Sequence, residues 1–227
     1  MKKILFIILC LSTSMYAQED IAGLVMPDTG FKSCCIYIPD SGLKLYNKPN
    51  GSLKGSIYLG KPDQHNEVYT AFIKANGIEK EIDHTTLDIV GYETMALKFV
   101  DIASGYAKLQ NDYWISIKEL ESKDMKLVFW MDYAVNKGIQ WYANDPGLNL
   151  RTGPSTDFKK IVTLKGDLFG ITPTGETKGK WSKVDIIQSN QHPCTGGDDR
   201  IINTYSGWVK LISEENTLNV WYYAKGC

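Results

Sequence analysis

The most informative part of the sequence is Leu148-Asn149-Leu150-Arg151-Thr152-Gly153-Pro154-Ser155. Apolar and polar residues alternate in its first half, so Leu148 and Leu150 share one face of a β-strand. Gly153 precedes Pro154, and proline restricts the residue before it while glycine tolerates most backbone angles. The segment therefore predicts a core strand that ends in a tight turn.

A weaker copy of the same pattern lies about 100 residues earlier in the chain. A separation of this size predicts two duplicated domains rather than a solenoid repeat. We place the domains at residues 28–120 and 136–215; the joint between them holds the apolar run 127–131 and is either an ordered strand or a flexible linker. The aligned segments are 42–49 with 147–154, 100–102 with 184–186, and 113–117 with 207–211.

Short β-prone runs, separated by Gly, Pro, Asn and Asp, occupy most of the chain and favour small barrels or sandwiches. No stretch has the sustained periodicity of a long helix; the best local candidate is residues 85–96, which Gly91 weakens. The predicted strands include residues 35–38, 67–73, 97–102, 113–117, 126–131, 160–164 and 181–187.

The second copy resembles the bacterial SH3 (SH3b) family through four motifs in the family's order. They are Leu148–Ser155, Ile161-Val162-Thr163-Leu164-Lys165-Gly166, Trp181-Ser182-Lys183-Val184 and Gly207-Trp208-Val209. The resemblance is clear over residues 145–212 and weak over 28–120, where Tyr46 replaces the motif's arginine and Lys48 its glycine. It implies an all-β protein made of two tandem SH3-like small β-barrels.

Two long segments depart from the family's pattern and are predicted loop insertions, at residues 60–92 and 188–205. Long loops on a rigid scaffold often carry binding determinants. These insertions are therefore where this protein should differ from a generic barrel.

Residues 1–17 have the order of a secretory signal peptide: a basic start, a short apolar core and small residues that end at Ala17. We predict cleavage after Ala17 and a periplasmic or secreted protein. The apolar run is too short to span a bilayer, and no second run reaches that length. Loss of Lys2 and Lys3 moves the formal charge from −1 to −3.

Four cysteines remain after cleavage, and an oxidising compartment permits disulfides between them. Adjacent Cys34 and Cys35 are poorly placed to bridge to each other. We favour a Cys194–Cys227 disulfide that tethers the C-terminal tail, residues 216–227; the alternative is buried, reduced cysteines. The tail includes an apolar run at residues 220–224, which should add a strand to the second barrel or dock on the first domain.

Several classes of function are disfavoured. The chain is nearly neutral and has only two arginines, Arg151 and Arg200, which argues against nucleic acid as a partner. The spacing of His192, Cys194 and the acids after them matches no standard zinc or calcium pattern, so we expect no metal and no cofactor. Motifs of serine hydrolases, zinc peptidases and phosphate-binding loops are missing from the sequence.

By the resemblance, the expected function is non-catalytic binding of cell-wall (peptidoglycan) peptide or glycan. Arg151, Asp157, Trp181 and Tyr205 are the candidates around a ligand groove, where Arg151 would pair with a carboxylate and an aromatic ring would stack on the ligand. The first alternative is an adaptor, inhibitor or subunit that binds an envelope protein. The second is a cysteine hydrolase that uses Cys34 or Cys35 with His65 or His84.

Overall fold

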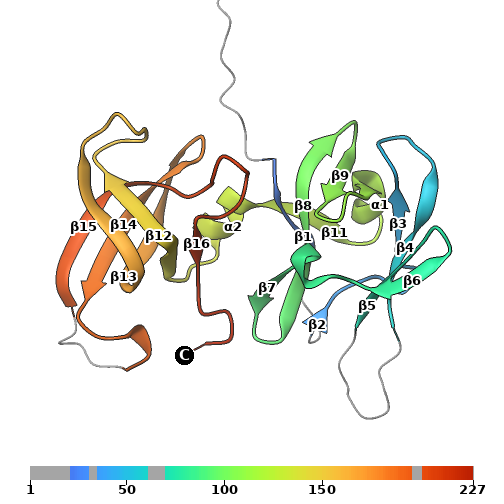
Figure 1. Cartoon of the computed structure of the whole chain (residues 1–227), viewed down its shortest axis with the longest axis horizontal. Coiled ribbons are helices and arrows are strands. Elements are labelled where there is room, and N and C mark those ends of the chain that lie inside the picture. The colour runs from blue at the N-terminus through green and yellow to red at the C-terminus, as the bar shows by residue number, and fades with distance from the viewer. Residues whose placement is uncertain (1–20, 31–34, 61–69, 196–200, 227) are drawn as a thin grey trace, which may run out of the picture.

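The computed structural model describes residues 21–30, 35–60, 70–195 and 201–226. It is predominantly β and contains an 11-stranded and a five-stranded sheet, which confirms the predicted all-β class. The two sheets lie side by side, with helix α2 between them (Figure 1). The predicted signal peptide, residues 1–17, is outside the described residues.

The first sheet runs in the order β11-β1-β8-β9-β10-β3-β4-β5-β6, with β2 and β7 also paired to β8. Its strands extend beyond the predicted domain at residues 28–120 on both sides. Among the described residues, no pairing joins its end strands β6 and β11. The strands are β1 (Gly23–Pro27), β2 (Cys35–Ile36), β3 (Leu43–Tyr46), β4 (Leu53–Leu59), β5 (Ala71–Ala75), β6 (Ile78–Glu81), β7 (Leu87–Gly91), β8 (Thr94–Ala103), β9 (Tyr106–Leu109), β10 (Trp114–Ser116) and β11 (Met125–Phe129).

The second sheet has the order β13-β14-β15-β12-β16. Because β12 pairs with β13 as well as with β15, four strands form a closed ring of pairings. Much of the predicted insertion at 188–205 is strand, since β14 and β15 stay paired as far as Ser189 and Ile201. The strands are β12 (Trp141–Arg151), β13 (Lys160–Lys178), β14 (Trp181–Ser189), β15 (Ile201–Lys210) and β16 (Val220–Trp221); a short 3-10 helix, η2 (Pro193–Thr195), follows β14.

The two sequence copies occupy equivalent places in their sheets. Tyr46 at the end of β3 pairs with Trp114 of β10. Arg151 at the end of β12 pairs in the same way with Trp208 of β15. The tryptophan of the closing motif is thus the cross-strand partner of the motif's fourth residue in both halves.

The position that begins each copy requires glycine for the same structural reason. Gly42 and Gly147 both have positive φ, a backbone conformation that residues with a side chain rarely adopt. A Cβ atom would lie 2.7 Å from the carbonyl oxygen of Ile57 at the first position and 2.5 Å from that of Leu164 at the second. Each glycine therefore lets its strand approach the backbone of its partner strand.

The predicted joint is ordered. Helix α1 (Ile117–Glu121) starts at Ser116, whose hydroxyl accepts a hydrogen bond from the Glu119 N–H. Strand β11 then joins the first sheet, and α2 (Trp130–Asn136) follows directly. The apolar run thus divides between a strand and a helix, and it is not a flexible linker.

Residues 85–96, the local helix candidate that Gly91 weakened, form no α-helix. Instead, the 3-10 helix η1 (His84–Thr86) leads into β7, which turns back into β8 as a hairpin. Asp83 caps η1 by accepting a hydrogen bond from the Thr85 N–H at 2.8 Å. The β-branched Ile89 and Val90 favour a strand, and Glu93 has the positive φ of a tight turn.

Two hydrophobic clusters form the core, and one of them crosses between the sheets. The first sheet encloses a cluster around Leu45, Ile57 and Phe99. The other cluster joins Leu24 and Ala96 of the first sheet to α2 and to the interior of the second sheet. The two halves therefore share buried apolar surface through α2. Within the described residues, no helix is both long and apolar enough to cross a membrane.

Candidate functional site

The C-terminal tail forms one wall of the candidate site. Val220 and Trp221 form β16, which pairs with Ala143 and Tyr142 of β12. The Trp221 indole Nε1–H donates to the Ala143 carbonyl at 3.3 Å. The tail thus adds a strand to the second sheet, and Figure 1 shows it descending between the two halves.

The tail also reaches the first sheet. The Tyr222 hydroxyl donates to the carbonyl oxygen of Ile89 in β7 at 3.2 Å. The same hydroxyl accepts from that of Tyr133 on α2 at 2.7 Å, and the Tyr133 hydroxyl also lies 3.4 Å from the Val90 carbonyl oxygen. This chain of hydrogen bonds links β7, α2 and the tail.

A cavity of about 570 Å³ lies between these elements, and we call it the aromatic cavity. Aromatic residues dominate its walls, and its polar groups are few. It is lined by Asp88, Ile89, Lys98, Trp130, Tyr133, Trp141, Asn144, Thr217, Leu218, Val220, Trp221, Tyr222, Tyr223, Ala224, Lys225 and Gly226.

The rings of the aromatic cavity hold one another in place. Trp141 packs edge-on against Tyr222 with ring centroids 4.8 Å apart, and Tyr133 packs on Trp141 at 6.0 Å. Trp221 and Tyr223 form another edge-on pair at 4.9 Å. Trp141 is almost fully buried and donates its Nε1–H to the Ala134 carbonyl at 3.1 Å. The rings of the walls are therefore positioned by packing on one another.

Charged groups lie at the side of the cavity formed by the first sheet. Burial raises the pKa of the Asp88 carboxyl, although Lys98 and Lys137 oppose this effect. Burial also lowers the pKa of Lys137. The Lys137 ammonium donates to the Val90 carbonyl and lies over the rings of Tyr133 and Tyr222, 4.9 and 5.2 Å from their centroids. Lys137 is thus held behind the cavity wall, whereas Asp88 and Lys98 line it.

A second polar cluster fastens the tail outside the cavity. The Tyr223 hydroxyl donates to Asp167 Oδ2 at 2.7 Å, which raises the pKa of Tyr223 to about 12. His192 Nε2 lies 3.0 Å from the same carboxylate oxygen and 2.9 Å from the Tyr223 hydroxyl. The Cys194 N–H donates to His192 Nδ1, so Nε2 carries the proton of the neutral ring. A metal at Nε2 would need Nδ1 to be the protonated nitrogen, so this cluster is a poor metal site.

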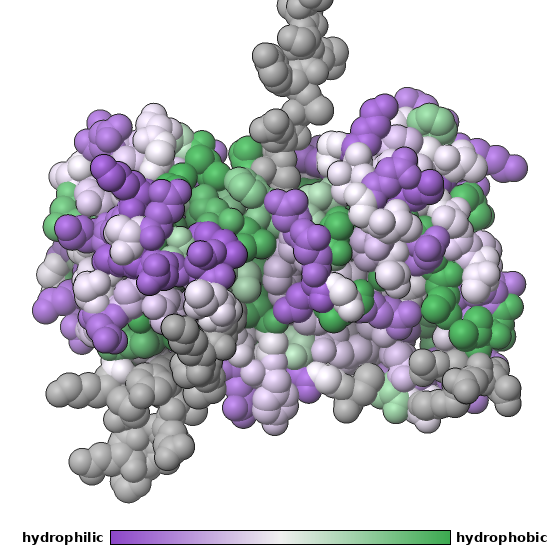
Figure 2. Space-filling model, turned by 180° about the vertical axis from the view of Figure 1, so that it is seen from behind, coloured by the Kyte–Doolittle hydropathy of each residue, from purple (hydrophilic) through white to green (hydrophobic). Residues whose placement is uncertain are grey.

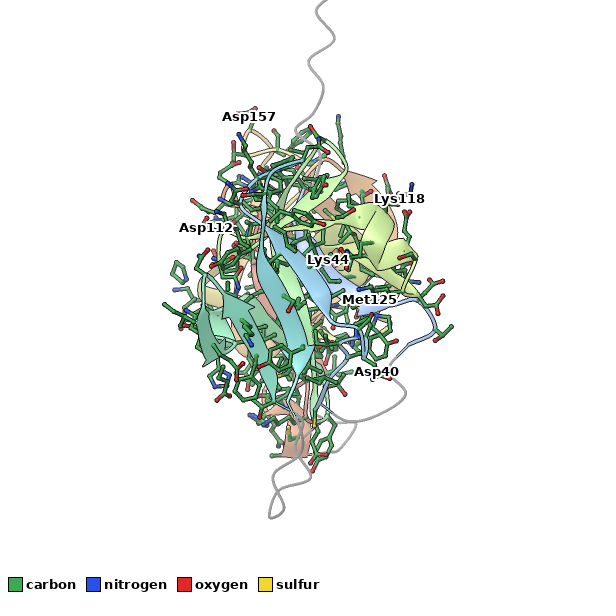
Figure 3. All side chains as sticks on the ribbon, turned by 90° about the vertical axis from the view of Figure 1, so that its right-hand side faces the viewer. Asp40, Lys44, Asp112, Lys118, Met125 and Asp157 are labelled. Atoms are coloured by element: carbon green, nitrogen blue, oxygen red, sulfur yellow. The ribbon has the colours of Figure 1, made fainter. Side chains whose placement is uncertain are left out.

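The structure places three of the four sequence-predicted groove residues at one end of the second sheet. Arg151 ends β12 and donates from Nη1 to the Phe158 carbonyl at 2.8 Å. Asp157 lies in the loop that follows, where it bonds with Ser155; Figure 3 shows it at the edge of the molecule. Trp181, on β14, lines a separate open cleft of about 330 Å³ together with Pro154, Lys178, Gly179, Lys180, Lys210 and Glu214.

The fourth predicted residue, Tyr205, lies elsewhere. It pairs with the buried Ile186, five residues along β14 from Trp181, which is roughly 17 Å. It packs on the core and donates its hydroxyl to Gln188 at 3.0 Å. The structure therefore does not bring Tyr205 together with the other three residues.

The remaining sequence candidates are also placed. Cys35 is buried in β2, and His84 is exposed in η1. Cys34, His65 and Cys227 are outside the described residues, so the proposed Cys194–Cys227 disulfide stays a prediction.

Sequence reasoning missed most of the aromatic cavity but pointed to two parts of it. The predicted insertion at 60–92 supplies Asp88 and Ile89, and the apolar tail supplies Trp221 and Tyr222. The residues of α2 carried no recognisable signal.

Exposed large apolar side chains are scattered over both halves and include Leu53, Ile78, Phe158, Ile201 and Ile202. The back of the molecule likewise shows separate hydrophobic patches among polar residues (Figure 2). Scattered apolar residues are normal on protein surfaces, so the aromatic cavity is the stronger candidate for a ligand. Comparisons with protein-family models, curated proteins and solved structures returned no match.

Proposed function

We propose that this chain is an exported, non-catalytic binding protein that recognises peptidoglycan, through a peptide or a glycan, in the aromatic cavity. The proposal includes a signal peptide at residues 1–17, two SH3-type halves and a Cys194–Cys227 disulfide that tethers the tail. The resemblance of the second copy to bacterial SH3 domains supports the ligand class. The aromatic cavity supports the proposed location of the binding site.

The observation that carries the proposal is the set of aromatic rings around one cavity. Tyr and Trp present a flat apolar face with a polar edge, and such faces stack on sugar rings and on peptide groups. Cavities of several hundred Å³ with a few placed polar groups are typical ligand sites. The aromatic cavity meets both conditions at about 570 Å³.

Its polar groups fit binding better than catalysis. The lining residues provide the carboxylate of Asp88 and the ammonium groups of Lys98 and Lys225, with no His, Cys or Ser among them. The tyrosine hydroxyls of Tyr133 and Tyr222 are bonded to each other and to backbone carbonyls. The Thr217 hydroxyl, also in the lining, is bonded to the Ser213 hydroxyl, and no described hydrogen bond joins it to a carboxylate or amine that could act as its base.

Co-sedimentation of residues 18–227 with purified peptidoglycan sacculi, at two salt concentrations, tests the proposal. Trp221→Ala removes a ring from the aromatic cavity, and Trp181→Ala removes a half-buried ring from the cleft on the second sheet. We expect binding that survives the higher salt, falls at least about tenfold in Trp221→Ala and persists in Trp181→Ala. Circular dichroism checks that both variants fold.

Absence of wild-type binding above a control protein would overturn the proposal and favour the envelope-protein adaptor. Loss of binding in Trp181→Ala alone would move the site to the outer cleft. Peptide mass mapping without reductant tests the tether; a peptide pair that links Cys194 to Cys227 is expected, and any other pairing contradicts it.

A further inference from the structure

Lys98 places a half-buried ammonium group among the aromatic walls of the cavity. On the β7–β8 hairpin Asp88 pairs with Ala96, so Lys98, two residues further on, lies diagonally across from Asp88 on the same face. Lys98 also pairs with Leu24, which belongs to the core shared between the halves. Both charged side chains therefore face the second half of the molecule and line the cavity.

The two charges are near each other but do not form an ion pair. Lys98 acts on the Asp88 carboxyl through its charge. Within the described part of the chain, no salt bridge or hydrogen bond engages the Lys98 ammonium. The half-buried ammonium thus keeps its donors available inside an aromatic-walled cavity.

The local charge is positive. Asp88 is the one carboxylate among the lining residues, whereas Lys98 and Lys225 contribute two ammonium groups. Behind the walls, Lys137 adds a positive charge next to Tyr133 and Tyr222, and Asp167 adds a negative charge next to Tyr223. Attraction between charges is stronger in a partly desolvated site than in water. The excess favours an anionic group in the ligand.

We propose that the aromatic cavity binds its ligand through a carboxylate, which accepts hydrogen bonds from Lys98 while the body of the ligand stacks on the tail's rings. This inference rests on the proposed function in that it takes the same cavity as the binding site. It adds a requirement that neutral sugars and amidated peptides do not meet.

Peptidoglycan offers such a carboxylate from two sources, and matched probes separate them. N-acetylmuramic acid differs from N-acetylglucosamine by its lactyl carboxylate and represents the glycan. N-acetyl-D-alanyl-D-alanine and its C-terminal amide, neither of which carries an ammonium, represent the peptide. Binding is followed by tryptophan fluorescence, because Trp130, Trp141 and Trp221 line the cavity.

The wild-type protein is expected to bind at least one acid about tenfold or more tightly than its neutral counterpart, since a charge-assisted hydrogen bond is lost with the carboxylate. Lys98→Met keeps the length of the side chain and should reduce the affinity for that acid by a similar factor. Lys74→Met, at an exposed position on β5, is the control and should change nothing.

Asp88→Asn tests whether the ligand group bound in the cavity is negatively charged. It removes the negative charge that competes with the ligand's carboxylate, so affinity for the acid should be kept or increased. A weaker affinity for the acid in this variant would mean that Asp88 assists binding instead of opposing the ligand's carboxylate, and the inference would be wrong.

Equal binding of the acid and its neutral counterpart would also overturn the inference, and this comparison needs no variant to fold. If sacculi still sediment the protein in that case, the proposed function stands without the carboxylate requirement. If the acids bind through Lys98 but sacculi do not sediment the protein, the cavity's chemistry stands and peptidoglycan is the wrong ligand source.

Discussion

The two halves of this chain share a local motif but differ in what surrounds it. Leu45 and Leu150 are both fully buried, and each lies one residue before the cross-strand partner of a tryptophan, Trp114 or Trp208. Around this motif the second half closes into a ring of four strands, whereas the first half extends into a longer path. The shared motif occupies an equivalent strand pairing in each half, and residues outside it line the cavity between them.

The unshared parts come from both halves. Strand β7 belongs to the predicted insertion at residues 60–92 and brings Asp88, whereas Lys98 lies on β8, outside that insertion. The tail follows the second copy and brings Trp221 and Tyr222. Both halves therefore contribute to the aromatic cavity between the two sheets.

The largest expected effect tests the shared motif. Leu45→Ala and Leu150→Ala each remove a side chain with no exposed surface, so each should lower the free energy of unfolding by about 2–5 kcal/mol. Urea denaturation followed by circular dichroism measures both. A loss confined to one of the two variants would break the structural equivalence of the copies.

The next effect tests the glycines that begin the copies. Gly42→Ala and Gly147→Ala combine a positive φ with a Cβ less than 3 Å from a carbonyl oxygen, and each should cost more than about 2 kcal/mol. Gly166→Ala is the control, because its φ is also positive but nothing lies within 4 Å, and it should cost about 1 kcal/mol. Similar thermal stability in all three variants would contradict the close approach.

A smaller effect tests the hydrogen bonds of the Tyr222 hydroxyl, which join the tail to α2 and β7. Tyr222→Phe removes the donor to Ile89 and the partner of Tyr133, and should cost about 1–2 kcal/mol. Faster amide exchange in β16 should accompany the loss. Unchanged stability and exchange would show that packing alone holds the tail on the first sheet.

The smallest effect tests Asp88, which has no counterpart in the second half. Its raised pKa means that the folded state favours the neutral carboxyl, so its stabilising contribution is complete below the unfolded-state pKa of about 4 and is lost as pH rises through the folded-state pKa. Asp88→Asn removes this dependence. The free energy of unfolding of the variant should therefore rise relative to that of the wild type between about pH 3 and about pH 7. A difference between the two proteins that does not change with pH would contradict the burial of Asp88.

Local signals explain what could be predicted from the sequence. Alternation at Leu148 and Leu150, the glycine before each copy and the repeated tryptophans all act within one strand or turn, and they indicated the all-β class. Tyr205 was wrongly grouped with the groove residues, because it alternates with Gly207 and Val209 and shares their inward face in β15. Read by its parity, it belongs to the core side of the strand.

The aromatic cavity could not be predicted in the same way. Its walls come from residues 88–98, 130–144 and 217–226, and their contact depends on how α2 and the tail dock between the sheets. Helix α2 is seven residues long, too short for a periodic pattern to identify it, and no side chain caps its start. The capping pair Ser116 and Glu119 did carry a local signal for α1.

The central claim is that the ligand binds between the halves. Hydrogen–deuterium exchange of residues 18–227, with and without solubilised peptidoglycan fragments, tests it most directly. We expect the fragments to slow exchange in residues 87–98 and 217–226, on both sides of the aromatic cavity. Protection confined to the cleft around Trp181 and the loop at residues 152–159, with no change in the tail, would contradict it.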